Sequence, residues 1–155
     1  MDIVLSHISA LRFWLSRPAC SVRLRYADPI LPVSALPKGK AAELAVYGGV
    51  PVHVLCAGPI KGGVRNGAIY HTWQGDLPTG SVARIAPGVC VCSPELAFLQ
   101  MAQTLDEISQ IQLGFELCGS YSLDARADGG FFKRSPLTTP ENSAHCAPSR
   151  KVDMG

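Results

Sequence analysis

Six cysteines and four histidines carry most of the reactive chemistry available to this chain. Cys90 and Cys92 alternate along an expected strand, so both thiols face the same side of it. Zinc sites usually pair their ligands as Cys-x-x-Cys or His-x-x-x-His, and the sequence contains neither spacing. The residues that could complete a metal site are His53, His71, Cys118, His145 and Cys146. Without paired spacing we expect buried free thiols, no metal ligands and no cofactor.

A cysteine nucleophile is the alternative use of the same residues. Such a nucleophile needs a base, and His71 or His53 would be the candidates. Nothing in the sequence marks one cysteine as a thiolate of low pKa. His71 stands between Tyr70 and Trp73 on an expected strand, where it could also stack on a nucleic-acid base. A half-exposed strand histidine is the simpler interpretation, and we assign no catalytic residue.

The charges of the chain are unevenly distributed. Residues 1–65 hold eight Lys/Arg against three Asp/Glu, whereas residues 66–155 hold six against nine. Within the basic half, residues 61–65 form a glycine-rich loop that could present backbone N–H groups and two cations to a phosphate, without the ending of a P-loop. If this basic half has a role, the pattern predicts weak, sequence-independent binding to nucleic-acid phosphates. A solvated basic surface without a ligand is the alternative. The candidate nucleic-acid-binding residues are Arg12, Arg17, Arg23, Arg25, Lys61, Arg65 and His71.

Short apolar segments and turn residues predict an N-terminal helix followed by a small sheet. Ser6 is a suitable N-cap for a helix whose apolar residues recur at i, i+3 and i+7 from Ile8. A second short helix is expected over residues 38–46. The expected strands are residues 52–56, 68–73, 81–85 and 89–92. Strands at this spacing indicate a small antiparallel sheet of three to five members.

Two packed helices are expected to follow the sheet. Ser93 caps the first and Pro94 suits its first position, while Thr104 and Glu107 would form a capping box for the second. The residues of the second helix that are expected to face inward are Leu105, Ile108, Ile111, Phe115 and Cys118. Gly119 is expected to end this helix in a left-handed conformation. Leu99 of the first helix is expected to share one core with Phe115.

The chain as a whole reads as a single α+β domain over residues 1–123, with an irregular to disordered tail over residues 124–155. Only 17% of the residues are charged, which excludes global disorder. Asp2 occupies the place where a signal peptide carries positive charge, so we expect no export. No window approaches the roughly 20 apolar residues that span a bilayer. A cytoplasmic location with reduced thiols is therefore expected.

Three motifs together resemble a bacterial family. Residues 6–11 read Ser-His-Ile-Ser-Ala-Leu, residues 52–55 read Val-His-Val-Leu before the basic loop, and residues 91–96 read Val-Cys-Ser-Pro-Glu-Leu. This order, with His71 before a Leu-Pro pair, resembles that of AbiEi-type antitoxin-related proteins and their relatives fused to restriction-endonuclease-like domains. The resemblance covers roughly residues 4–137.

The chain departs from that family at both ends. Relatives often open with a winged helix-turn-helix, for which there is no room before Ser6. Others continue beyond a Pro-Leu-Thr element, like that at residues 136–138, into a nuclease-like domain with clustered Asp, Glu and Lys. The sequence is therefore expected to be a truncated form of the longer architecture. No family site residue is carried over to it.

The resemblance implies a non-catalytic module of an antitoxin-like or nuclease-associated protein, with DNA or a protein partner such as a toxin-like or nuclease domain. An enzyme is the alternative, either a fragment of a metal-dependent nuclease or a thiol-based hydrolase. A pure protein-interaction module is the third interpretation. Salt-sensitive DNA binding would favour the first class, and activity lost to a chelator or a thiol reagent would favour the second. The sequence leaves the oligomeric state open.

Overall fold

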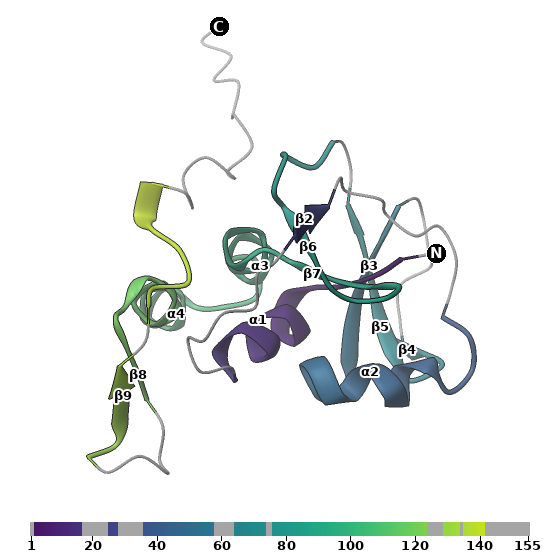
Figure 1. Cartoon of the computed structure of the whole chain (residues 1–155), viewed down its shortest axis with the longest axis horizontal. Helices are drawn as coiled ribbons and strands as arrows, with labels where there is room; N and C mark the ends of the chain where they lie inside the picture. The colour runs from purple at the N-terminus through teal and green to yellow at the C-terminus, as the bar shows by residue number, and fades with distance from the viewer. Residues whose placement is uncertain are drawn as a thin grey trace, which may run out of the picture.

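The computed structural model describes residues 2–16, 25–27, 36–57, 64–73, 76–123, 129–133 and 135–141. Over these residues the chain forms one seven-stranded mixed sheet, four helices and a separate two-stranded ribbon (Figure 1). The α+β class expected from the sequence is confirmed, as are the N-terminal helix and the pair of helices after the sheet. No helix among the described residues has the length and apolar character that crossing a membrane requires.

The main sheet has the strand order β2-β6-β7-β1-β3-β5-β4. Its members are β1 (Ile3–Leu5), β2 (Arg25–Ala27), β3 (Val52–Ala57), β4 (Val64–Arg65), β5 (Ala68–Trp73), β6 (Val82–Ala86) and β7 (Val89–Cys92). β1 is parallel to β7 and antiparallel to β3, and β3 is parallel to β5. The sheet is therefore mixed and larger than the antiparallel sheet of three to five members that the sequence predicted.

The error comes from β1, a three-residue strand directly before the first helix that the sequence did not predict. Its backbone pairs on both sides, with Val4 opposite Leu55 of β3 and Cys90 of β7. Val4 and Leu5 have no exposed surface. A strand this short shows no measurable alternation, so only its neighbours in space identify it.

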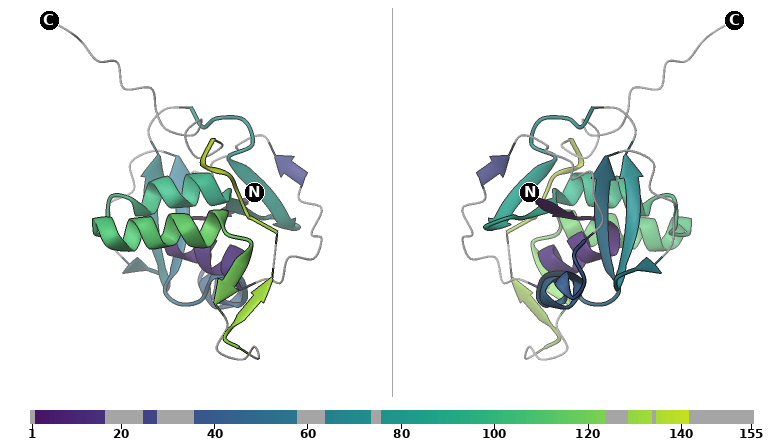
Figure 2. Two further views of the ribbon diagram at one scale, coloured as in Figure 1. Left: turned by 90° about the vertical axis from the view of Figure 1, so that its left-hand side faces the viewer. Right: turned by 90° about the vertical axis from the view of Figure 1, so that its right-hand side faces the viewer.

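Four helices cover the sheet or extend from it. They are α1 (His7–Leu15), α2 (Lys40–Gly48), α3 (Pro94–Met101) and α4 (Glu107–Cys118). α1 packs against α2, α3 and the central strands, whereas α4 lies beside α3 on the side away from the sheet (Figures 1 and 2). The fold thus places α4 as an outer layer.

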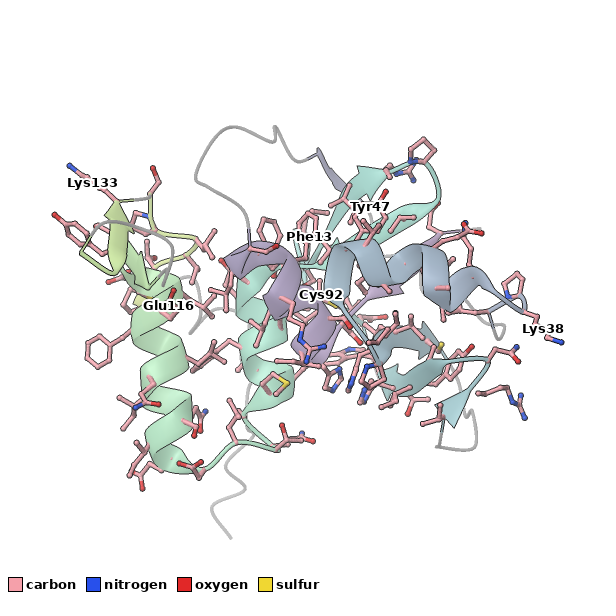
Figure 3. All side chains as sticks on the ribbon, turned by 90° about the horizontal axis from the view of Figure 1, so that it is seen from below. Phe13, Lys38, Tyr47, Cys92, Glu116 and Lys133 are labelled. Carbon is pink, nitrogen blue, oxygen red and sulfur yellow. The ribbon has the colours of Figure 1, made fainter. Side chains whose placement is uncertain are left out.

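The central helix α1 is held to the sheet by apolar packing and one buried hydrogen bond. Phe13 and Trp14 are buried with their rings edge to face, 5.3 Å apart between centroids. The indole Nε1 of Trp14 donates to the carbonyl oxygen of Cys92 at 2.8 Å, which ties α1 to the end of β7. Figure 3 shows Phe13 and Cys92 within the body of the molecule.

The start of α3 agrees with the sequence prediction. The Ser93 hydroxyl accepts a hydrogen bond from the backbone N–H of Leu96 at 3.3 Å, and Pro94 opens the helix. Leu96 and Ala97 are buried, while Leu99 is half-buried. The core of this helix therefore faces β7 and α1 through Leu96 rather than through Leu99.

The start and end of α4 differ from the prediction. Its N-cap is Asp106 and not Thr104. The Asp106 carboxylate accepts a hydrogen bond from the backbone N–H of Ser109 at 3.0 Å. The Thr104 hydroxyl instead donates to the carbonyl of Met101, because this residue still belongs to the turn that ends α3. Gly119 has φ −77°, so the expected left-handed terminator is also wrong.

The orientation of α4 is the largest correction. Ile108, Ile111 and Phe115 were expected to face the core, but they are 69%, 53% and 76% exposed. The helix packs instead through Leu117, its only buried residue, and the partly buried Leu113. These two leucines lie on the opposite side of the helix from the exposed residues, since each residue turns the chain by 100°.

The chain beyond residue 120 returns to α4. A ribbon of β8 (Tyr121–Leu123) and β9 (Phe131–Lys133) crosses the expected domain boundary at residue 123. The backbone N–H groups of Leu137 and Thr138 then donate to the carbonyl of Leu117, at 2.9 and 3.3 Å. Thr138 is buried and its hydroxyl donates to the Glu95 carboxylate. Residues 142–155 of the expected disordered tail lie outside the described residues.

We predict that the loss of stability on truncating a side chain of α3 or α4 to alanine depends on how deeply that side chain is buried and not on its size. Leu96→Ala should lower the free energy of unfolding by about 2–5 kcal/mol, because it opens a cavity in the core. Phe115→Ala should change it by about 0.5 kcal/mol or less, because this ring is already in water. Urea unfolding of both variants measures the difference. A larger loss for Phe115→Ala than for Leu96→Ala would contradict the observed orientation of α4.

Candidate functional site

The basic residues predicted from the sequence do not form one site in the described structure. Arg17, Arg23, Lys61 and the side chain of Arg25 lie outside the described part. The Arg12 guanidinium donates to the carbonyl of Val50 at 3.2 Å, in the turn between α2 and β3. Arg65 is exposed on the edge strand β4. The ring of His71, the remaining candidate, faces other histidines.

Three histidines from three different elements meet at one point. β3 and β5 are parallel with Leu55 opposite His71, so His53 and His71 project from the same face of the sheet. His53 Nδ1 lies 2.8 Å from His71 Nε2, a hydrogen-bond distance. The ring of His7, the first residue of α1, stacks on His71 with 3.4 Å between centroids. We call His7, His53 and His71 the histidine cluster.

Several contacts hold His7 in an uncommon backbone conformation. Its φ of 48° lies in the left-handed region, which costs a non-glycine residue about 1–2 kcal/mol. Its backbone N–H donates to Oε1 of the buried Gln100 at 2.9 Å, and its Nδ1 lies 3.1 Å from the Ser6 hydroxyl. The backbone N–H of Ser6 donates to the carbonyl of His53 at 3.0 Å. These bonds fix the first turn of α1 against β3 and α3.

The histidine cluster is uncharged at neutral pH. Burial, and then the nearby His71 and His53, lower the pKa of His7 to about 3. Burial and His53 lower the pKa of His71 to about 4, and burial together with Arg12 lowers the pKa of His53. A general base works best with a pKa near the working pH, and the pKa values of His7 and His71, about 3 and about 4, lie far below it. The cluster therefore suits a polar structural contact better than proton transfer.

The described cysteines do not supply an activated nucleophile. Cys56, Cys90, Cys92 and Cys118 are free thiols, and burial raises the pKa of each, to about 12 for Cys92. A thiol with a raised pKa stays protonated and is a poor nucleophile. Over the described residues, no group of three or more His, Cys, Asp or Glu side chains is placed to hold a metal ion. Cys20, like Cys146 and His145, lies outside the described part.

An exposed apolar surface on α4 is the other unusual feature. Ile108, Ile111 and Phe115 recur at i, i+3 and i+7 and so form one stripe, which we call the α4 face. It borders a hollow of about 370 Å³ between α3, α4 and Pro140. That hollow is lined by Phe98, Ile111, Gly114, Phe115, Leu117, Cys118 and Pro140.

A second, larger hollow lies on the other side of α4. It has a volume of about 860 Å³ and runs between α1, the end of α3 and α4. Apolar residues such as Ile8, Leu15 and Leu105 line it, with Arg12 and Glu116 among its polar residues. α4 is therefore flanked by apolar surface on both sides, and Phe115 borders both hollows.

Comparison with known proteins adds no further guide to this site. No family model matches the chain, nor does any curated protein or solved structure. The resemblance to AbiEi-type antitoxin-related proteins thus stays a prediction from the quoted motifs.

The sequence predicted neither the histidine cluster nor the exposure of the α4 face. His7 lies within the Ser-His-Ile-Ser-Ala-Leu motif but was not associated with His53 or His71, which are far from it along the chain. The residues of the α4 face were recognised as one stripe and were assigned to the wrong side. Leu113 and Leu117, spaced i, i+4, were the signal of the second stripe that packs inward.

The lowered pKa values predict that acid destabilises the fold. The unfolded chain binds protons on these histidines below pH 6.5, whereas the folded chain resists protonation of His71 down to about pH 4 and of His7 down to about pH 3. Stability should therefore fall as the pH drops from about 6.5 towards 4. The lowered pKa values alone would imply a larger effect, but solvent screens these partly exposed rings. We therefore expect the cluster to change the folding equilibrium constant by about tenfold over this pH range.

Urea unfolding at pH 7 and at pH 4.5 measures this loss. Replacing His7 and His71 together by Asn removes two of the three titrating groups, those with the lowest pKa values, so the double variant should lose less stability between these pH values than the wild type. An equal loss in both proteins would show that groups other than His7 and His71 account for the acid sensitivity.

Two glycines allow a matched test of helix packing. A Cβ at Gly114 would lie 3.8 Å from Phe98 Cε2, an ordinary contact, so Gly114→Ala should raise the free energy of unfolding by up to about 1 kcal/mol. A Cβ at Gly48 would lie 2.6 Å from the Cβ of Ser9, so Gly48→Ala should lower it by forcing α1 and α2 apart. Thermal unfolding followed by circular dichroism distinguishes the two. Destabilisation by Gly114→Ala would contradict the open space described beside α4.

Proposed function

We propose that this chain is a non-catalytic, protein-binding module of an antitoxin-like or nuclease-associated protein, and that it holds its partner on the α4 face. The observation that carries the proposal is the exposure of Ile108, Ile111 and Phe115 along a single helix. Soluble proteins rarely leave a continuous apolar surface with adjoining hollows in water unless another molecule covers it. The partner class that the motifs suggest is a toxin-like or nuclease domain.

The poor support for an enzyme strengthens this choice. The described thiols are protonated, and the histidine cluster is neutral and bonded within itself. A thiol hydrolase would need one of these groups in its ionised, reactive form near a base. A metal-dependent nuclease would need grouped carboxylates, and the described residues offer no such group.

Nucleic-acid binding is a second candidate with a narrower basis. Arg65 is exposed on an edge strand, and Arg12 lies exposed on α1, although its guanidinium bonds Val50. Exposed arginines of this kind bind phosphates without reading sequence. The apolar α4 face has no use in such binding, which is why we prefer a protein partner.

The proposal predicts that a partner is lost when the α4 face is made polar. The test expresses this chain together with a toxin-like or nuclease-like domain, the partner class proposed above, and purifies the complex. Ile111→Ser with Phe115→Ser should weaken the complex at least tenfold, as expected when central apolar side chains of an interface are removed.

Val46→Ser is the matched control, because Val46 is also apolar and is 80% exposed but lies on α2. It should leave the complex unchanged. Circular dichroism checks that the α4 variant is folded. A folded double variant that binds as tightly as the wild type would rule out the α4 face as the partner surface.

A further inference from the structure

We infer that the α4 face takes a basic amphipathic helix as its occupant. This inference rests on the proposed function, since it names the chemistry of the partner segment that the same surface would bind. Its basis is the combination of an apolar stripe, adjoining hollows between helices and a border that carries only negative charge on its α3 and α4 side.

The shape of the surface suits a helix. Ile108 and Phe115 are seven residues apart, which is about 10 Å along the helix axis or two turns. An amphipathic helix that lies along such a stripe places side chains at i, i+3, i+4 and i+7 into the adjoining grooves. Gly114 leaves the hollow beside Phe98 open, because a side chain at this position would enter it.

The charges carried by α3 and α4 are acidic, and Arg12 of α1 is the basic residue among those that line the larger hollow. Residues 85–123 contain four acidic residues and no Lys or Arg, a balance of −4. Glu107 stands one turn before Ile111, and Glu116 lines the larger hollow together with Phe115. Cys118 lies in the smaller hollow, where burial and then the nearby charges of Glu141 and Glu95 raise the pKa of its thiol. Figure 3 shows Glu116 on α4 and Lys133 directed away at the end of β9.

These charges argue against a second copy of the chain as the occupant. In a two-fold dimer the same patch faces itself, so Glu107 and Glu116 of one α4 would approach those of the other. Like charges brought together at an interface oppose association. A helix with Lys or Arg beside its apolar stripe would instead meet opposite charge at Glu107 on one border and at Glu116, in the hollow that Arg12 also lines, on the other.

Two designed peptides test the inference on the complete chain. One is an 18-residue helix with Leu on one face and Lys on the other, and its match replaces every Lys by Glu. We expect the Leu/Lys peptide to bind at least tenfold more tightly than the Leu/Glu peptide in fluorescence anisotropy at low salt, with a smaller difference at high salt. Gly114→Leu should weaken the binding of the Leu/Lys peptide at least tenfold by filling the hollow, and Val46→Ser should leave it unchanged.

A charge variant separates the inference from the proposed function. Glu107→Gln with Glu116→Gln should reduce the preference for the Leu/Lys peptide while the α4 face still binds an apolar stripe. Equal binding of both peptides, sensitive to Phe115→Ser, would overturn the basic partner and leave the protein-binding function intact. Binding of neither peptide, or binding insensitive to Phe115→Ser and Gly114→Leu, would overturn both. Sedimentation that shows a wild-type dimer and a monomeric Phe115→Ser variant would identify a second copy as the occupant.

Discussion

The pairing of β1 on both of its edges is the interaction on which the rest of the fold depends. This three-residue strand joins β7, which precedes the outer helices, to β3 and its parallel neighbour β5. At its ends the backbone N–H of Ile3 donates to Gly88 and that of Ser6 donates to His53. Without β1 the main sheet would divide into β2-β6-β7 and β3-β5-β4. A segment of three residues is stable here only because both edges are hydrogen-bonded and Val4 and Leu5 are fully buried.

The direction of α1 follows from the same strand. The chain leaves β1 at Ser6 and enters the helix through a left-handed residue, His7, whose N–H bonds Gln100 of α3. The strain at His7 is offset by contacts on three sides, from Ser6, Gln100 and the ring of His71. The histidine cluster thus forms polar contacts between α1 and the sheet. Its histidines are neutral at neutral pH because they are partly buried and close to one another. This explains why a histidine occupies a position where its backbone is strained.

The outer helix α4, unlike α1, is held to the rest of the fold by few contacts. α4 is joined to the rest through Leu117, the partly buried Leu113 and the bonds from Leu137 and Thr138 to its last turn. The side chains of Ile108, Ile111 and Phe115 are exposed, so they contribute little to the free energy of folding. A helix with so few buried contacts keeps its structure through local features such as the Asp106 cap, and gains more from a partner than a fully packed helix would. The difference between the two layers is the physical ground for the proposed partner surface on α4.

The sequence by itself determined the α+β class and the existence of α1, α3 and α4, because periodicity and the Ser93-Pro94 cap act within a few residues. It also located β3, β5, β6 and β7 to within a residue or two. Only the tertiary structure decided the mixed pairing, since β1 is too short to show a pattern and its partners are about fifty and ninety residues away. It alone decided which of two stripes on α4 faces inward, because both stripes are apolar and the space left beside α3 selects one. The meeting of His7, His53 and His71 was beyond sequence reasoning for the same reason, since it depends on the register of β3 and β5 and on the turn that begins α1.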